Sequence, residues 1–221
     1  TAYEIYQCDW SSDVCSSDLS TAQTSALSNG QVSSLTTDQI QALQTRNIAT
    51  LSTAQIQALG DTGADVLTSA QINALTTGQA AALTTAQIAT LSTDQITALS
   101  VNNIRVLTVA QAAALNSEQV NAFSTAQIGA LSTADVRALT TDAIGGLSGT
   151  QMAALSTLQV SLLTTTQIHA LATDQIAAME TADIRALTTA QAMVLSSEQA
   201  AALTAAQVAA LETADLRLMS T

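Results

Sequence analysis

Residues 51–58 read LSTAQIQA, and closely similar words follow as LTTAQIAT at 83–90, LSTDQITA at 91–98 and LTTTQIHA at 163–170. The shared pattern is Leu-[Ser/Thr]-[Ser/Thr]-[Ala/Asp]-Gln-[Ile/Val]-x-Ala, which we call the octad, with Leu at position 1. Leucine returns every eighth residue from Leu19 to Leu211, and only Phe123 and Met179 replace it. A fixed period of this kind is typical of repeat proteins, which grow in one dimension by stacking.

An eight-residue period excludes one continuous α-helix. Eight residues exceed two helical turns by about 80°, so successive leucines would move around the helix and leave no apolar stripe. A β-solenoid is the alternative fold, because an even period keeps strand register. It would, however, point Leu at position 1 and Ile at position 6 to opposite faces, and Ala is depleted in strands.

The remaining arrangement is a helix that is interrupted once in every octad. Ser or Thr at position 2 and Gln at position 5 have the spacing of a capping box, in which each side chain binds the other's backbone N–H. The pairs include Thr36/Gln39, Ser52/Gln55, Thr84/Gln87, Ser92/Gln95, Ser124/Gln127 and Thr164/Gln167. Octad 179–186 has Glu180 at position 2. The sequence therefore leaves open whether the cap lies at position 2 or 3.

Acidic residues recur at position 4, which would fall in the first helical turn, where a negative charge favours the helix dipole. They are Asp38, Asp94, Glu118, Asp142, Asp174 and Glu198. A helix this short is far below the roughly 12–15 residues that an isolated helix needs. Stability must therefore come from neighbouring turns of a superhelix that bury each other's Leu, Ile and Ala. The predicted fold is all-α, a solenoid of very short helices with one helix per octad.

The first residues share nothing with the octads. Residues 8–19 read CDWSSDVCSSDL, and Asp9 to Leu19 closely resemble the translation of a common short-read sequencing adapter. We interpret 1–18 as a non-native leader, so that Cys8 and Cys15 indicate nothing about redox compartment. The octad solenoid is then predicted over 19–221, as a fragment of a longer protein.

The charge balance argues against two classes of partner. The formal net charge is −12, and the five basic residues are all arginine. Nucleic acids and anionic membranes are bound by basic surfaces, so we expect neither as a partner. The chain also lacks an apolar run of about 18–20 residues, and we expect no membrane insertion.

Departures from the octad follow a pattern of their own. Where Asp replaces Gln at position 5, and also at Asn103, Arg follows two residues later. The pairs are Asp135/Arg137, Asp183/Arg185, Asp215/Arg217 and Asn103/Arg105. Residues two apart do not face each other on a helix. Each Arg is therefore predicted to reach an adjacent turn, in an ion pair that adjusts the stack.

The octads offer no constellation for chemistry. His169 is the single imidazole of the chain, and we expect it to face solvent at position 7. Gly60, Gly63, Gly145 and Gly146 fall in octads 59–66 and 139–146, where they predict a bend or local defect instead of a phosphate-binding loop. We predict no catalytic, cofactor-binding or metal-binding residues, no cofactor and no enzyme activity.

The octad tract resembles the low-complexity Leu-Thr-Thr-Ala-Gln-Ile repeats of very large bacterial surface or secreted proteins. The resemblance implies a structural spacer or adhesin-like stalk, exported to the cell surface or the extracellular space. Two other functions stay open: a solenoid scaffold that binds a protein, and a surface that binds ice through paired threonines. The expected contacts are end-to-end self-association and the flanking domains of the parent protein.

Overall fold

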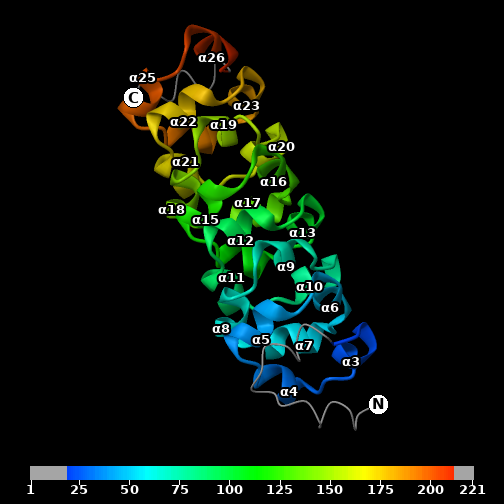
Figure 1. The fold of residues 1–221 in the computed structure, drawn as a ribbon. Coiled ribbons are helices and arrows are strands. Elements are labelled where there is room, and N and C mark those ends of the chain that lie inside the picture. Colours follow the sequence, from blue (N-terminus) through cyan, green and yellow to red (C-terminus); the bar gives the residue numbers. More distant parts are fainter. Residues whose placement is uncertain (1–18, 212–221) are drawn as a thin grey trace. The chain divides into compact units, whose positions relative to one another are not determined.

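The computed structural model describes residues 19–211, and every octad in this range forms one α-helix of four to six residues. These residues contain helices and connecting turns without a β-strand (Figure 1). The predicted solenoid of short helices is confirmed, and the β-solenoid alternative is wrong. The leader interpretation of 1–18 and the Asp215/Arg217 pair lie outside the described residues.

The chain divides into two compact units between Gln111 and Ala112. The helices of the first unit are α3 (Thr21–Ser25), α4 (Asn29–Ser33), α5 (Thr37–Ala42), α6 (Thr45–Thr50), α7 (Thr53–Ala58), α8 (Gly60–Asp65), α9 (Ser69–Asn73), α10 (Thr77–Ala82), α11 (Thr85–Thr90), α12 (Thr93–Ala98) and α13 (Val101–Arg105). Helix α14 (Val109–Ala113) contains the division. The helices of the second unit are α15 (Ser117–Ala122), α16 (Thr125–Ala130), α17 (Thr133–Ala138), α18 (Thr141–Gly145), α19 (Gly149–Met152), α20 (Thr157–Ser161), α21 (Thr165–Ala170), α22 (Thr173–Ala178), α23 (Thr181–Ala186), α24 (Thr189–Met193), α25 (Ser197–Ala201) and α26 (Ala205–Ala210).

Most of the helices begin where the capping box predicts, with α8 as an exception. In α11 the N-cap is Thr84, whose Oγ1 accepts from the N–H of Gln87, while the N–H of Thr84 donates to Gln87 Oε1. The helix ends at Thr90, and the C-cap Leu91 has left the helical conformation (φ −59°, ψ 132°). The N-cap lies at position 2 even where its side chain makes no capping hydrogen bond. In α23 the N-cap is Glu180, whose backbone N–H donates to the carboxylate of Asp183.

Helices pack against the helix three places along the chain, so they form columns within each unit. The first unit has columns α3–α6–α9–α12 and α4–α7–α10–α13, and a pair α8–α11. The second unit has columns α15–α18–α21–α24, α16–α19–α22–α25 and α17–α20–α23–α26. Neighbouring turns of the solenoid therefore bring together octads that are three places apart in the sequence.

The apolar positions of the octad fill the interior of each unit. Ile56, Ile96 and Ile168, all at position 6, are completely buried. Leu at position 1 is nearly so, as at Leu91 and Leu139 (3% and 4% exposed). Because burying such a side chain contributes roughly 1.5–3 kcal/mol, these two positions supply most of the apolar driving force of the fold.

Octad 59–66 is the local defect that its glycines predict. Gly60 has a φ of +68°, a conformation that side chains with a Cβ disfavour. This lets α8 begin one position earlier than its neighbours, directly after the N-cap Leu59. Gly63 occupies the position of the usual Gln, where an added Cβ would lie 3.0 Å from that of Leu59.

The glycines of octad 139–146 also predict a bend or local defect, but the structure gives Gly146 another role. Gly146 is the C-cap of α18 with an ordinary φ of −79°, and α18 packs in its column against α15 and α21. The residue is instead needed for close packing, since an added Cβ would lie 3.0 Å from the Cβ and 3.1 Å from the carbonyl oxygen of Ser117. The prediction of a defect is wrong here, because glycine serves the contact between α15 and α18.

Candidate functional site

The glutamines at position 5 form the main array of buried polar side chains. Gln71 is typical: it is 2% exposed, and its Oε1 accepts from the N–H of Thr68 at 2.8 Å. Its own N–H donates to the hydroxyl of Thr68, which completes the capping box. This half of the Gln function is the one that the spacing predicts.

The other end of the same amide binds a different turn of the solenoid. Gln71 Nε2 donates to the carbonyl oxygens of Ile40 at 2.7 Å and Leu43 at 2.8 Å. These carbonyls lie in the last turn of α5 and at its C-cap, four helices earlier, where helical carbonyls have no partner within the helix. One side chain therefore caps the start of its own helix and the end of another.

The arrangement repeats at the same sequence separation in both units. The Nε2 atom donates to the Leu-position carbonyl 28 residues earlier from Gln55, Gln71, Gln79, Gln95, Gln111, Gln151, Gln159, Gln167, Gln175, Gln191, Gln199 and Gln207. A primary amide with both ends hydrogen-bonded is chemically inert. The array binds the scaffold together and offers no acid, base or nucleophile.

Asparagine at position 5 makes only some of the hydrogen bonds that glutamine makes there. Asn47 and Asn103 donate to one carbonyl each, those of Leu19 at 2.9 Å and Leu75 at 3.1 Å. The side chain is one methylene shorter than Gln, and the Oδ1 of Asn47 is buried without a hydrogen-bond partner. Gln is therefore the residue whose length matches both ends of the contact.

Aspartate at position 5 retains the capping box. Asp135 and Asp183 are 1% and 2% exposed, and each carboxylate accepts from the N–H of its N-cap residue, at 3.0 and 3.1 Å. The ion pairs expected with Arg137 and Arg185 stay a prediction. For Arg105 the expected reach to an adjacent turn is wrong, because its Nη1 donates to Asn102 Oδ1 in its own helix at 3.0 Å.

His169 faces solvent, as expected, but it also joins two turns. Its Nδ1 lies 3.0 Å from the carbonyl oxygen of Val194, 25 residues later. Gln41 and Gln57, also at position 7, make the same contact with carbonyls 25 residues later. Position 7 is therefore a second site of bonding between turns, which its varied composition conceals in the sequence.

An open hollow of 420 Å³ adjoins this contact, on the outer surface of α21 and α24. Its lining is Thr165, Thr166, His169 and Val194, and it is largely apolar. We call it the α21–α24 hollow. The lining residues include no carboxylate or thiol that could act together with the imidazole of His169. The hollow therefore has the character of a contact surface.

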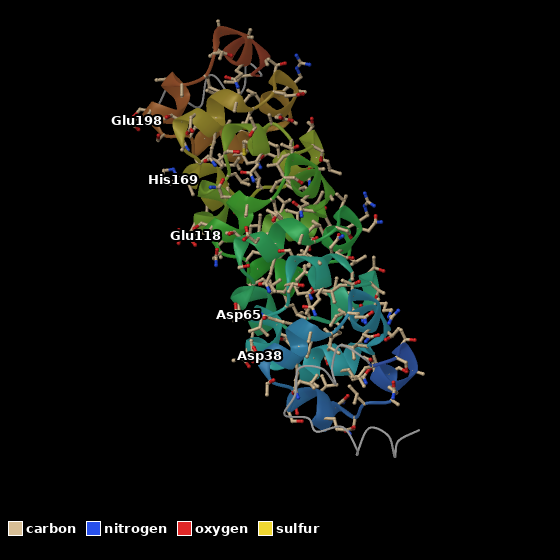
Figure 2. All side chains as sticks on the ribbon, viewed as in Figure 1. Asp38, Asp65, Glu118, His169 and Glu198 are labelled. Carbon is tan, nitrogen blue, oxygen red and sulfur yellow. The ribbon has the colours of Figure 1, made fainter. Side chains whose placement is uncertain are left out.

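The acidic residues of position 4 lie on the outside, in the first helical turn (Figure 2). The pKa of Glu198 is lowered by hydrogen bonds that it accepts from its own backbone N–H and then from the hydroxyls of Ser196 and Ser197. Within residues 19–211 we find no group of three or more His, Cys, Asp or Glu side chains that could hold a metal ion.

A family model for the ALTTAQ repeat matches the chain seven times. The matches cover residues 40–77, 74–109, 93–125, 102–133, 120–157, 130–165 and 176–212, which is more than half of the chain. The chain belongs to the ALTTAQ repeat family. A search of curated proteins finds no match. Each match spans several octads, as expected for a repeat whose partners lie three and four places away.

The ALTTAQ helices described by the structure are all too short to span a bilayer. The expected absence of site residues and of nucleic-acid binding remains a prediction. The hydroxyl groups at position 2, which an ice-binding surface of paired threonines would need, already accept from backbone N–H groups, as at Thr68 and Thr84.

Proposed function

We propose that this chain is a non-enzymatic structural repeat module, a spacer or stalk within a large bacterial surface or secreted protein. One observation supports it above the others: positions 1, 2, 5 and 6 of the ALTTAQ repeat are all used to build the scaffold. Leu and Ile fill the interior, the hydroxyl starts the helix, and Gln joins two turns. A protein that repeats only its scaffold residues gains length and regularity with each added octad.

The outer positions support the same proposal. Positions 3, 4 and 7 are mostly exposed and carry mainly small, polar and charged residues. Such a surface keeps an acidic chain soluble and does not repeat a pattern that would bind one particular ligand. An exported stalk needs both properties, and the cell surface or the extracellular space is therefore the proposed location.

The spacer proposal is tested by changing the number of octads. Chains with three or six additional octads, inserted after residue 98, should gain maximum dimension in equal steps in small-angle X-ray scattering. Their helical signal in circular dichroism should rise in proportion. Inserting four residues at the same place is the matched control, and it should disrupt the stack. A maximum dimension that does not grow with octad number would contradict a spacer.

The proposed location is tested on the intact parent protein. An antibody against the octad tract should label intact cells that express the parent protein, and brief protease treatment of those cells should remove the label. Labelling only after lysis would place the repeats inside the cell and overturn this part of the proposal.

A further inference from the structure

Two columns of the second unit have complementary surfaces. We call α15–α18–α21–α24 the acidic column, because Glu118 and Asp142 lie exposed on successive helices of it. We call α17–α20–α23–α26 the arginine column, because it holds Arg137 and Arg185, both exposed. Figure 1 shows α15, α18 and α21 along one edge of this unit and α20 and α23 along the opposite edge.

The arginine column also presents apolar side chains to solvent. Leu158 on α20 is 62% exposed, and Leu162, the C-cap of α20 four residues later, is 41% exposed. Arg137 lies one helix before them in the column and Arg185 one helix after. Because exposed leucines at adjacent positions of a helix surface mark interaction sites, this face is the strongest candidate for an interface in the second unit.

The acidic column has the matching features in the same order. Asp142 lies on α18, and the α21–α24 hollow begins on α21, the next helix of the column. On the arginine column, Arg137 lies on α17 and Leu158 on α20, again the next helix. Both steps run toward the C-terminus. On each column, therefore, a charged residue lies one helix before an apolar feature: Asp142 before the α21–α24 hollow, and Arg137 before Leu158.

We propose that a second copy of this chain docks parallel to the first, with Leu158 of one copy in the α21–α24 hollow of the other. In this register Arg137 of the first copy lies beside Asp142 of the second. The contact joins two different surfaces, so each copy keeps one free face and further copies can add side by side. This inference goes beyond the spacer proposal and does not depend on it, since it concerns how copies associate.

A disulfide-trapping experiment tests the register. In the full chain, Cys8 and Cys15 are replaced by serine, and two single-cysteine chains are then made, Leu158→Cys and Thr166→Cys. After mixing and mild oxidation, the mixed dimer should form about tenfold faster than with Thr150→Cys in place of Thr166→Cys. Thr150 is the matched control: it is an exposed threonine at position 4 like Thr166, but on α19 in another column. Equal rates for the two mixtures would overturn the proposal.

Charge exchange tests the second contact in chains that retain leucine at 158. Arg137→Asp and Asp142→Arg should each weaken self-association, measured by sedimentation equilibrium, by about fivefold, as expected for an exposed ion pair. The double variant should recover the association to within about twofold, because the pair is restored with its signs exchanged. Circular dichroism establishes that each variant is folded. Failure of the double variant to recover, or no association of the parent chain at its highest soluble concentration, would overturn the proposal.

Discussion

The side-chain nitrogen of Gln95 lies 2.7 Å from the carbonyl oxygen of Leu67, although 28 residues separate them in the sequence. The same nitrogen contacts the carbonyl oxygens of Ala64 at 3.0 Å and Asp65 at 2.9 Å. The end of α8 and the start of α12 are thereby joined by one amide. In this fold the hydrogen bonds between solenoid turns are made by side chains, and their spacing follows the pitch of the stack.

Replacing Gln95 by methionine should therefore be costly. Methionine has nearly the same shape but leaves the carbonyl of Leu67 and the N–H of Ser92 without the contacts they have now. We expect the free energy of unfolding to fall by about 1–3 kcal/mol in urea denaturation followed by circular dichroism. Gln57→Met is the matched control, because Gln57 is exposed, and it should change stability by less than about 0.5 kcal/mol. Equal losses in both variants would show that burial of the amide is unimportant.

The two hydroxyls that begin an octad should differ sharply in their contribution. Thr84 accepts from the N–H of Gln87 at 3.0 Å, whereas the neighbouring Thr85 lies in the first turn of α11. Thr84→Ala should lower the free energy of unfolding by about 1 kcal/mol, the usual value for a lost N-cap. Thr85→Ala should lie within about 0.5 kcal/mol of the unchanged chain, since Thr85 is exposed. The cap assignment fails if Thr85→Ala is the more damaging change.

Local features of the fold were predictable because they depend on residues within one octad. The Ser52/Gln55 spacing predicts both the start of α7 and its cap, and the structure confirms both. The eight-residue return of leucine excludes one long helix by geometry alone. The acidic preference for position 4 follows from the helix dipole and is confirmed at Asp38 and Glu198.

Contacts between turns were not predictable from the same pattern. The partners of Gln71 lie 28 and 31 residues away because the pitch of the stack sets that distance, and no single octad encodes it. The role of His169 as a contact between turns was missed for the same reason. Gly146 predicts a bend or local defect from the sequence, whereas in the structure it allows the close approach of Ser117.

Glu198 should make the stability of its helix depend on pH in the acidic range. Its pKa is lowered from 4.5 in the folded chain by the hydrogen bonds to its carboxylate, so the carboxylate form favours folding. The contribution is present above the pKa of the unfolded chain and is lost as pH falls through the lower pKa of the folded state. In an NMR titration, Ser197→Ala should raise the pKa of Glu198, because one donor is removed.

The matched variant for this effect is Glu198→Gln. The difference in free energy of unfolding between it and the unchanged chain should shrink as pH falls below 4.5, because the protonated carboxyl resembles the amide. A difference that grows with acidity would reverse the sign of the linkage and contradict the lowered pKa.

Two glycines should respond in opposite directions to the same substitution. Neither Gly60 nor Gly78 has an atom within 4 Å of an added Cβ, so the comparison isolates the backbone. Gly60 has a φ of +68°, where a side chain costs about 1–2 kcal/mol, and Gly60→Ala should lower stability by about that amount. Gly78 lies within α10, and Gly78→Ala should raise stability by about 0.5–1 kcal/mol because alanine loses less entropy in a helix. Thermal and urea unfolding of both variants measure the two signs directly. If Gly60→Ala were neutral, α8 could start at position 3 like the other helices, and the defect in octad 59–66 would not need a left-handed residue.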